Sequence, residues 1–251
     1  MTHSAPVGKH SIGGWPAGAK GTPLCRLGYA VLHDDDRKLP AWSSYRLTEA
    51  KATACLARTN DFRPDEKLPA HGRAQLADYK GSGYDRGHIV PAGDMQWSKD
   101  AMSQSFLLSN MAPQLGSFNR GIWKQLETWV RIWARDRAEI LVLDGPYYEG
   151  DEGTIGPNQV SVPRGFFKVA IDPRTNEAQA FVLPHGKIPS KDLPHYQVSV
   201  REVEQRTGLD FFPSLSKDEQ DALESSVATP WPANLATWTK ERKAICPADK
   251  D

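Results

Sequence analysis

The sequence lacks the features that mark several special classes of protein. Its 251 residues contain no internal repeat, no low-complexity segment and no apolar run near the roughly 20 residues that span a bilayer. Basic and acidic residues number 31 each, so the net charge is zero. That balance argues against a protein that coats nucleic acid through bulk charge. A local basic patch is still allowed, and segment 119–137 has an excess of basic residues that a solvated helix face would explain equally well.

Cysteine is also scarce, and its spacing excludes one kind of metal site. Cys25, Cys55 and Cys246 form no CxxC pair and have no zinc-like spacing with histidine. The sequence also has no HExxH motif, so a zinc hydrolase is disfavoured. One disulfide with one free thiol, or three free thiols, are both compatible with this count.

The two ends of the chain differ in composition from the middle. Residues 1–23 are rich in Gly, Pro and Ser and lack the apolar core of a signal peptide, so any such signal has been removed or never existed. We expect these residues to form a flexible arm. Residues 24–226 should form one domain, and 227–251 a tail that packs on it or extends from it.

The middle of the chain mixes strand and helix signals. Runs rich in β-branched and aromatic residues predict strands at 25–33, 41–47, 138–145, 166–172 and 178–184. Strands and helices are interspersed without tight strand–helix–strand alternation. This pattern favours the α+β class, with a largely antiparallel central sheet flanked by helices.

Helical spacing of apolar residues predicts a long helix over 117–137, with Ser117 as its N-cap. Two shorter helices are predicted to begin at capping boxes, formed by Ser199 with Glu202 and by Ser216 with Glu219.

The stretch GYDRGHIVP, residues 83–91, places Arg86 and His88 among residues that disfavour helix. Glycine and proline weaken helices, so the stretch should be a strand or turn that holds polar groups in a fixed place. A single histidine after glycine is more often structural than catalytic. Its interpretation therefore depends on what lies near it.

A second stripe runs along the predicted long helix. Asn119, Trp123, Glu127 and Arg131 are spaced by four, so they lie on neighbouring turns. A surface pair of Glu127 and Arg131, worth only a few tenths of a kcal/mol, would explain part of the stripe.

Taken together, the two stretches supply the parts of a hydrolytic site. A neutral imidazole accepts a proton near neutral pH. Amide and carboxylate oxygens are hard ligands that suit Mg²⁺, which keeps several waters. Arginine binds phosphate through paired hydrogen bonds. These are the components of metal-assisted phosphodiester hydrolysis.

The motifs also resemble those of a known family. YDRGHIVPAGD followed by FLLSNMAPQLGSFNRGIWKQLE is similar to the DNA/RNA non-specific endonuclease family, which includes sugar-non-specific bacterial nucleases and endonuclease G. The likeness extends over roughly residues 24–225. It implies a ββα-metal (His-Me finger) active site, in which a hairpin strand bears the histidine and the following helix bears the metal ligand.

The resemblance implies roles for four residues at the reaction centre. His88 is the expected general base that activates water. Asn119 is the expected direct Mg²⁺ ligand, and Glu127 acts through waters on the metal. Arg86 is expected both to assist catalysis and to contact the substrate phosphate. Mn²⁺ or another divalent cation can substitute for Mg²⁺.

The resemblance also implies residues that bind or support the substrate. Arg63 and Arg86 are expected to contact phosphates, although Arg63 could instead pair with a neighbouring aspartate. Arg131 is expected to assist Glu127 or the phosphate. Asn110 is placed with the substrate-binding residues as a support of the site.

These roles predict an endonuclease that cuts single- and double-stranded DNA and RNA with little sequence preference. A nucleic-acid-binding protein without catalysis and a phosphodiesterase for smaller substrates are the alternatives. Because an unselective nuclease would damage its own cell, we expect a secreted or periplasmic enzyme, with compartmentation or a protein inhibitor as alternatives. A homodimer is compatible with the resemblance, and no membrane association is expected.

Overall fold

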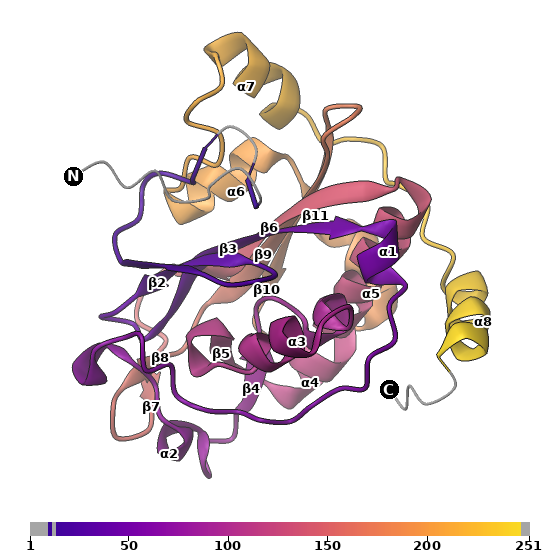
Figure 1. Ribbon diagram of the computed structural model, residues 1–251. Helices are drawn as coiled ribbons and strands as arrows, with labels where there is room; N and C mark the ends of the chain where they lie inside the picture. The colour runs from indigo at the N-terminus through magenta and orange to yellow at the C-terminus, as the bar shows by residue number, and fades with distance from the viewer. Residues whose placement is uncertain (1–9, 12–13, 247–251) are drawn as a thin grey trace.

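The computed structural model describes residues 10–11 and 14–246, and its centre is a seven-stranded antiparallel sheet (Figure 1). The strand order is β1-β2-β3-β6-β9-β10-β11. These strands are β1 (Thr22–Cys25), β2 (Ala30–Asp34), β3 (Leu39–Thr48), β6 (Glu139–Tyr147), β9 (Gly165–Asp172), β10 (Glu177–Pro184) and β11 (Gln197–Val198). Two small hairpins stand apart from it, formed by β4 (Asp85–His88) with β5 (Met111–Gln114) and by β7 (Thr154–Ile155) with β8 (Val160–Ser161). The predicted α+β class is confirmed.

Side chains of alternate residues on the sheet face two separate cores. On β6, Ile140 and Val142 belong to one apolar cluster, whereas Leu141 and Leu143 belong to the other. Helix α5 (Lys124–Asp136) packs in the first cluster, while α6 (Val200–Thr207) and α7 (Lys217–Glu224) pack in the second. The sheet is therefore covered on both faces, as Figure 1 shows.

The predicted strand over 25–33 is wrong, because the chain reverses within it. The Arg26 amide donates to the Tyr29 carbonyl at 2.8 Å, and this turn joins β1 to β2. Gly28 lies against Met95, where a β carbon would come within 2.3 Å of the sulfur. A larger residue here would require the Met95 side chain to move. The other four predicted strands are confirmed, with ends that shift by a few residues.

The predicted long helix over 117–137 is divided. A short helix α4 (Gly116–Phe118) leads into a π-helical turn, η5 (Asn119–Trp123), and α5 follows. Gly121 has non-helical backbone angles, φ −104° and ψ −112°, which explains the break. The predicted N-cap is also wrong, because Leu115 occupies that position and its side chain makes no cap. Inserted π turns of this kind are frequent at functional sites.

Both short helices begin where predicted. The Ser199 side chain accepts from the Glu202 amide, and Ser216 with Glu219 forms a complete capping box. The remaining helices are α1 (Glu49–Ala52), α2 (Leu76–Tyr79), α3 (Lys99–Ser105), α8 (Leu235–Ile245) and the short turns η2 (Ala70–Gly72), η3 (Ala92–Met95), η4 (Leu108–Asn110) and η6 (Ser190–Tyr196). Within the described ranges, none of the helices combines the length and the apolar character needed to cross a membrane.

The described parts of the two predicted end segments lie on the domain. Residues 1–9, 12–13 and 247–251 are outside the description. Trp15 packs edge-on against Trp42 with ring centroids 5.0 Å apart. In the tail, α8 lies beside α5 (Figure 1). A disulfide joins Cys55 to Cys246, and Cys25 is a free, exposed thiol.

Candidate active site

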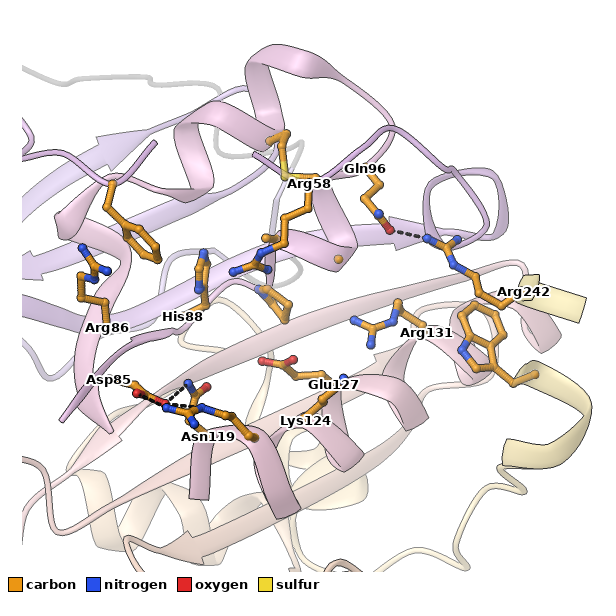
Figure 2. A pocket seen from close by; sticks show the side chains of 17 residues that line it. Arg58, Asp85, Arg86, His88, Gln96, Asn119, Lys124, Glu127, Arg131 and Arg242 are labelled. Atoms are coloured by element: carbon orange, nitrogen blue, oxygen red, sulfur yellow. Dashed lines mark hydrogen bonds and ion pairs between the residues drawn. The ribbon is translucent and has the colours of Figure 1, made fainter. Parts of the chain in front are cut away.

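One cleft brings together most of the predicted site residues. Its lining includes Arg86, His88, Asn119, Glu127 and Arg131 (Figure 2). They come from strand β4, the π turn η5 and helix α5, so the predicted strand, hairpin and helix do meet at one place.

The hairpin strand is held tightly by its partner. In the β4–β5 ladder Gly87 pairs with Ala112, and His88 pairs with Met111. The Gln114 side chain lies on Gly87, where a β carbon would come within 2.2 Å of it. Glycine between Arg86 and His88 therefore allows close packing and fixes where the two side chains project.

His88 lies in a largely buried aromatic pocket. Its ring packs against Phe62 and, edge-on at a centroid distance of 4.9 Å, against Phe106. Only 8% of the residue is exposed, and its Nε2 has no hydrogen-bond partner among the described residues. Burial, together with the charges of Arg58 and Arg86, lowers the pKa of His88 to about 3. The imidazole is therefore neutral throughout the physiological range.

The core beneath the cleft supports the same strand. The Trp123 indole donates to the His88 carbonyl at 3.2 Å. The Lys168 ammonium lies 4.6 Å from the Trp123 ring centroid and pairs with buried Asp144. This stack ties the hairpin to β6 and β9 of the large sheet.

Asn119 is oriented by Asp85. Its Nδ2 donates to Asp85 Oδ2 at 3.0 Å, and Arg120 donates to both oxygens of the same carboxylate at 3.0 and 2.6 Å. Although partial burial opposes the shift, these hydrogen bonds lower the pKa of Asp85. The amide nitrogen of Asn119 is thus committed to Asp85, which leaves its oxygen as the group available for a ligand. Asp85 therefore links the hairpin to the π turn.

Glu127 and Arg131 lie further along the helical side of the cleft, on α5. Arg131 donates to Asp94 at 3.0 Å, and Asp94 is fully buried and also accepts from the Tyr45 hydroxyl. Burial raises the pKa of Glu127 to about 7; Arg131 opposes this shift, and Asp94 adds to it. A half-buried carboxylate of this kind favours a nearby cation.

The donor set fits a hard cation that keeps most of its water. In the part of the chain that the structure describes, no group of three or more His, Cys, Asp or Glu side chains is placed to hold a metal. The cleft instead offers the oriented Asn119 oxygen and the Glu127 carboxylate. Few protein oxygens with several waters is the coordination typical of Mg²⁺.

Comparison with known proteins identifies the family. The profile of the DNA/RNA non-specific endonuclease family matches residues 7–218. The chain belongs to this family. Its members' names support the predicted activity, and the chain is a DNA/RNA non-specific endonuclease.

Individual relatives are similar over most of the chain. Nuclease 1, mitochondrial, of Schizosaccharomyces pombe is 35% identical over 221 residues, which cover 80% of this chain and 69% of the relative. Endonuclease G, mitochondrial, of Homo sapiens is 36% identical over 205 residues, or 76% of this chain and 69% of the relative. A crystal structure of the EndoG/EndoGI complex matches with a TM-score of 0.78 and 29% identity, covering 87% of this chain and 96% of that one. The structural match supports the ββα-metal nuclease fold.

These names correct one expectation. The predicted secreted or periplasmic location is wrong, because the yeast and human relatives of this nuclease are both named as mitochondrial. The prediction rested on the need to keep an unselective nuclease from the cell's own nucleic acid. A closed compartment meets that need as well as export does.

Two predicted substrate-binding residues of the nuclease do not line its cleft. Arg63 lies outside the lining, and its guanidinium donates to Asp61 and Ser103. Asn110 is fully buried, and its amide accepts from the Val90 amide and donates to the Val90 carbonyl, both at 2.9 Å. Asn110 therefore holds the chain just after His88 and does not line the cleft, a position that suits a supporting role.

Sequence reasoning missed four cations that do line the cleft. One is Arg120, which pairs with Asp85. Arg58 stacks on Phe106 at 4.9 Å, Lys124 projects from the start of α5, and Arg242 comes from α8 (Figure 2). Lys124 lies between Asn119 and Glu127 in sequence, so its position was a usable signal. The lining now holds more cations than acids, namely Arg58, Arg86, Arg120, Lys124, Arg131 and Arg242 against Asp85 and Glu127. A protein of zero net charge thus concentrates positive charge where a polyanion would bind.

Proposed function

We propose that this nuclease is a Mg²⁺-dependent, sugar-non-specific endonuclease that hydrolyses phosphodiester bonds of DNA and RNA. One observation carries the proposal: a neutral histidine, an oriented amide oxygen and a carboxylate line a single cationic cleft. The family is divalent-metal-dependent in general, and the donor set of this chain favours Mg²⁺ within that class.

His88 serves as the general base. The ring nitrogen that faces the cleft takes a proton from a water molecule, whose oxygen forms a new bond to phosphorus. The bond from phosphorus to one sugar oxygen then breaks, and that oxygen takes up a proton from water to become a hydroxyl, while the proton on His88 passes to solvent. Positioned general-base catalysis of this kind contributes about 10²–10⁴-fold to the rate.

Substrate binding would strengthen this base. A pKa of about 3 suits a neutral imidazole but makes it a weak proton acceptor. Part of that low pKa comes from Arg58 and Arg86, whose charges a phosphate would neutralise. The pKa of His88 should therefore rise when the anionic substrate enters.

Asn119 and Glu127 would hold the metal, Asn119 directly and Glu127 through water. When bound, a divalent cation supplies positive charge that stabilises the phosphorane-like transition state and the leaving oxygen. Asp85 keeps the Asn119 oxygen available, and Arg131 is held beside Glu127 by Asp94. Arg86 lies over the Phe62 ring at 4.1 Å, which positions its guanidinium for phosphate.

The same chemistry explains weak selectivity. Arginine and lysine contacts to phosphate carry no base information. Discrimination between RNA and DNA needs a contact at the 2′-hydroxyl. The charged groups described in the cleft suit phosphate, so both nucleic acids, single- and double-stranded, are proposed as substrates.

Control of the enzyme is proposed from the relatives. Their names favour a mitochondrial compartment. The EndoG/EndoGI complex concerns inhibition of EndoG, which supports a protein inhibitor as a partner here. A homodimer stays a proposal from the family resemblance.

Digestion of plasmid DNA and of an unstructured RNA tests the proposal. Both should be cut internally with Mg²⁺, and EDTA should stop both reactions. Cleavage of a small phosphodiester alone would favour the phosphodiesterase alternative. Binding of duplex without any cleavage, at saturating Mg²⁺ or Mn²⁺, would favour a binding protein that has lost catalysis.

A further inference from the structure

The helical turn that carries Asn119 begins without a side-chain cap. Leu115 is the residue before α4, and its apolar side chain offers no acceptor to the first turn. Its carbonyl accepts from the amides of Phe118 and Asn119, both at 2.9 Å. The position of Asn119 therefore depends on how the backbone of Leu115 is held.

A histidine from the large sheet holds that backbone. The Leu115 amide donates at 2.7 Å to Nε2 of His185, the residue that follows β10. A ring nitrogen that accepts carries no proton, so the proton of the neutral ring is on Nδ1. Nδ1 donates it to the Pro163 carbonyl at 3.1 Å. The main-chain amide of His185 donates to the Arg164 carbonyl at 2.9 Å. The histidine is thus fixed on the segment before β9 and presents one acceptor to Leu115.

The ring of His185 also contacts the residues that precede Asp85 and Asn119. The Tyr84 ring centroid lies 5.9 Å from it, and the Phe118 ring packs edge-on at 5.4 Å. Asp85 and Asn119 follow these two aromatic residues directly, and Figure 2 shows the hydrogen bond that joins them. His185 itself lies outside the cleft lining, so it acts on the site through these neighbours.

The surroundings of His185 favour the neutral ring that this arrangement needs. Burial lowers its pKa, although the hydrogen bond to Pro163 and the charge of Glu152 oppose the shift. A protonated ring would donate from both nitrogens and could not accept from Leu115.

We propose that His185 is a positioning residue for the metal site, because its Nε2 fixes the backbone that sets the place of the Asn119 oxygen. The inference rests on the proposed function and adds a residue outside the motifs from which that function was predicted. It implies a selective defect. Loss of the acceptor should displace Asn119 and weaken metal binding, while the arginines of the cleft still bind the nucleic-acid backbone.

Two variants separate the acceptor from the bulk of the ring. His185→Gln keeps an oxygen that can reach the place of Nε2, whereas His185→Leu fills the space without an acceptor. His185→Leu should weaken Mn²⁺ affinity by about 10-fold, the lower end of the loss when a partner that orients a metal ligand is removed. His185→Gln should restore most of that loss. Calorimetric titration without substrate measures both, and His71→Leu, at an exposed histidine, is the control.

Binding of a DNA duplex in EDTA gives the second readout. His185→Leu should bind the duplex as the wild type does, because its cationic residues are unchanged. Mn²⁺ affinity equal to that of the wild type would overturn the proposal. A His185→Gln variant as weak as His185→Leu, or an equal loss of metal and duplex binding, would also overturn it, since the acceptor would then not be what positions the site.

Circular dichroism checks that the variants are folded. If His185→Leu does not fold, His185→Asn takes its place, because its shorter side chain can reach Pro163 but not Leu115, and the same loss is expected. A wild-type protein that binds no Mn²⁺ and cuts neither DNA nor RNA overturns the proposed function itself. A wild-type protein that does both, with His185→Leu indistinguishable from His71→Leu, overturns only the role of His185.

Discussion

The cleft has a hairpin wall, on β4, that carries His88, and a helix wall, on η5 and α5, that carries Asn119 and Glu127. Burial shifts the pKa values of the titratable groups on these two walls in opposite directions. On the hairpin wall, burial lowers the pKa of His88 to about 3 and keeps a potential cation neutral. On the helix wall, burial raises the pKa of Glu127 to about 7 and favours a neutral carboxylic acid. Desolvation disfavours the charged form of either group, so a single physical cause shifts the two in opposite directions.

The difference shows what each wall is built to receive. Arg58 and Arg86 surround His88, so an incoming phosphate relieves positive charge on that side. Burial is the main cause of the raised pKa of Glu127; Arg131 and Lys168 oppose the shift, and Asp94 and Asp144 add to it. An incoming cation on that side would therefore stabilise the ionised carboxylate. Without a ligand, the surroundings of each group disfavour its charged form. A ligand of one sign, an anion at His88 and a cation at Glu127, would stabilise that form. This is the arrangement expected at a functional site, where charge is organised before the ligand arrives.

The largest expected effect on the hairpin wall is the loss of turnover when His88 is removed. His88→Ala should lower turnover on double-stranded DNA by about 10²–10⁴-fold, because it removes the base without removing a metal ligand. Mn²⁺ binding, measured by calorimetry, should persist in the variant. His195→Ala, at an exposed histidine, is the matched control. A near-normal rate for His88→Ala at saturating Mg²⁺ would refute the base assignment.

On the helix wall, the main expected effect is weaker metal binding when Asn119 is removed. Asn119→Ala should raise the Mg²⁺ concentration needed for half-maximal activity or abolish activity, with Glu127→Ala acting in the same direction to a lesser degree. Asp85→Asn should weaken metal affinity by about 10–100-fold, the usual effect of removing a partner that orients a ligand. Mn²⁺ titration by calorimetry measures all three. A crystal grown with Mn²⁺ that places the ion on histidine and cysteine would contradict this assignment.

The comparison also shows what the sequence could predict. Order and spacing of DRGH and N-x-x-x-W-x-x-x-E led to a cleft that contains His88, Asn119 and Glu127. Most strands of the sheet could be predicted because they are rich in β-branched and aromatic residues. The π turn could not be predicted, because a periodicity analysis assumes a continuous helix, and only Gly121 indicated the break.

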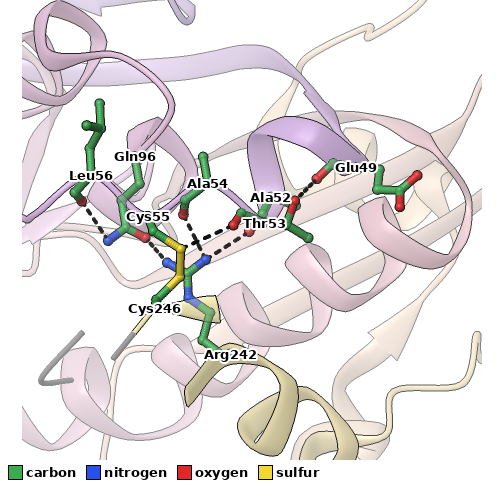
Figure 3. Close-up of a disulfide and its surroundings, with 9 residues drawn as sticks. All are labelled: Glu49, Ala52, Thr53, Ala54, Cys55, Leu56, Gln96, Arg242 and Cys246. Carbon is green, nitrogen blue, oxygen red and sulfur yellow. Dashed lines mark hydrogen bonds between the residues drawn. A yellow bond between two sulfur atoms is a disulfide. The ribbon is translucent and has the colours of Figure 1, made fainter. Parts of the chain in front are cut away.

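Charges in the cleft were harder to predict than its motifs. Arg63 lies in a motif of the family but donates to Asp61 and Ser103 outside the lining, whereas Arg58, five residues earlier, lines the cleft. Which of two arginines in one irregular segment reaches a site depends on tertiary packing. Arg242 reaches the cleft because a disulfide between Cys55 and Cys246 holds α8 against the domain (Figure 3). The sequence alone did not decide how the three cysteines pair.

The pH dependence of stability should distinguish the two walls without any ligand. Glu127 has a folded pKa above its unfolded value of about 4.3, so its contribution to stability is lost as pH rises from there to about 7. His88 has a folded pKa below its unfolded value of about 6.5, so its contribution is lost as pH falls from there to about 3.

Each group contributes a slope of at most about 1.4 kcal/mol per pH unit to the free energy of unfolding. Urea unfolding in EDTA should show that Glu127→Gln removes a negative slope of stability against pH between about pH 4.3 and 7, and that His88→Gln removes a positive slope between about pH 3 and 6.5. If both variants changed the slope in the same direction, the opposition between the two walls would be false.

The smallest expected effect concerns a single arginine on the hairpin wall. Arg86 lines the cleft and lies over Phe62, whereas Arg63 is occupied by Asp61 and Ser103 outside it. Arg86→Ala should therefore flatten the slope of log affinity against log salt by about 0.9 on duplex DNA, the amount for one phosphate contact. Arg63→Ala should leave the slope nearly unchanged, which makes it the matched control. Both should act alike on duplexes of unrelated sequence, because phosphate contacts carry no base information. Binding in EDTA across a salt series gives the slopes. Equal flattening in the two variants would mean that Arg63 leaves its aspartate to bind the backbone, and that the hairpin wall extends further than the cleft seen here.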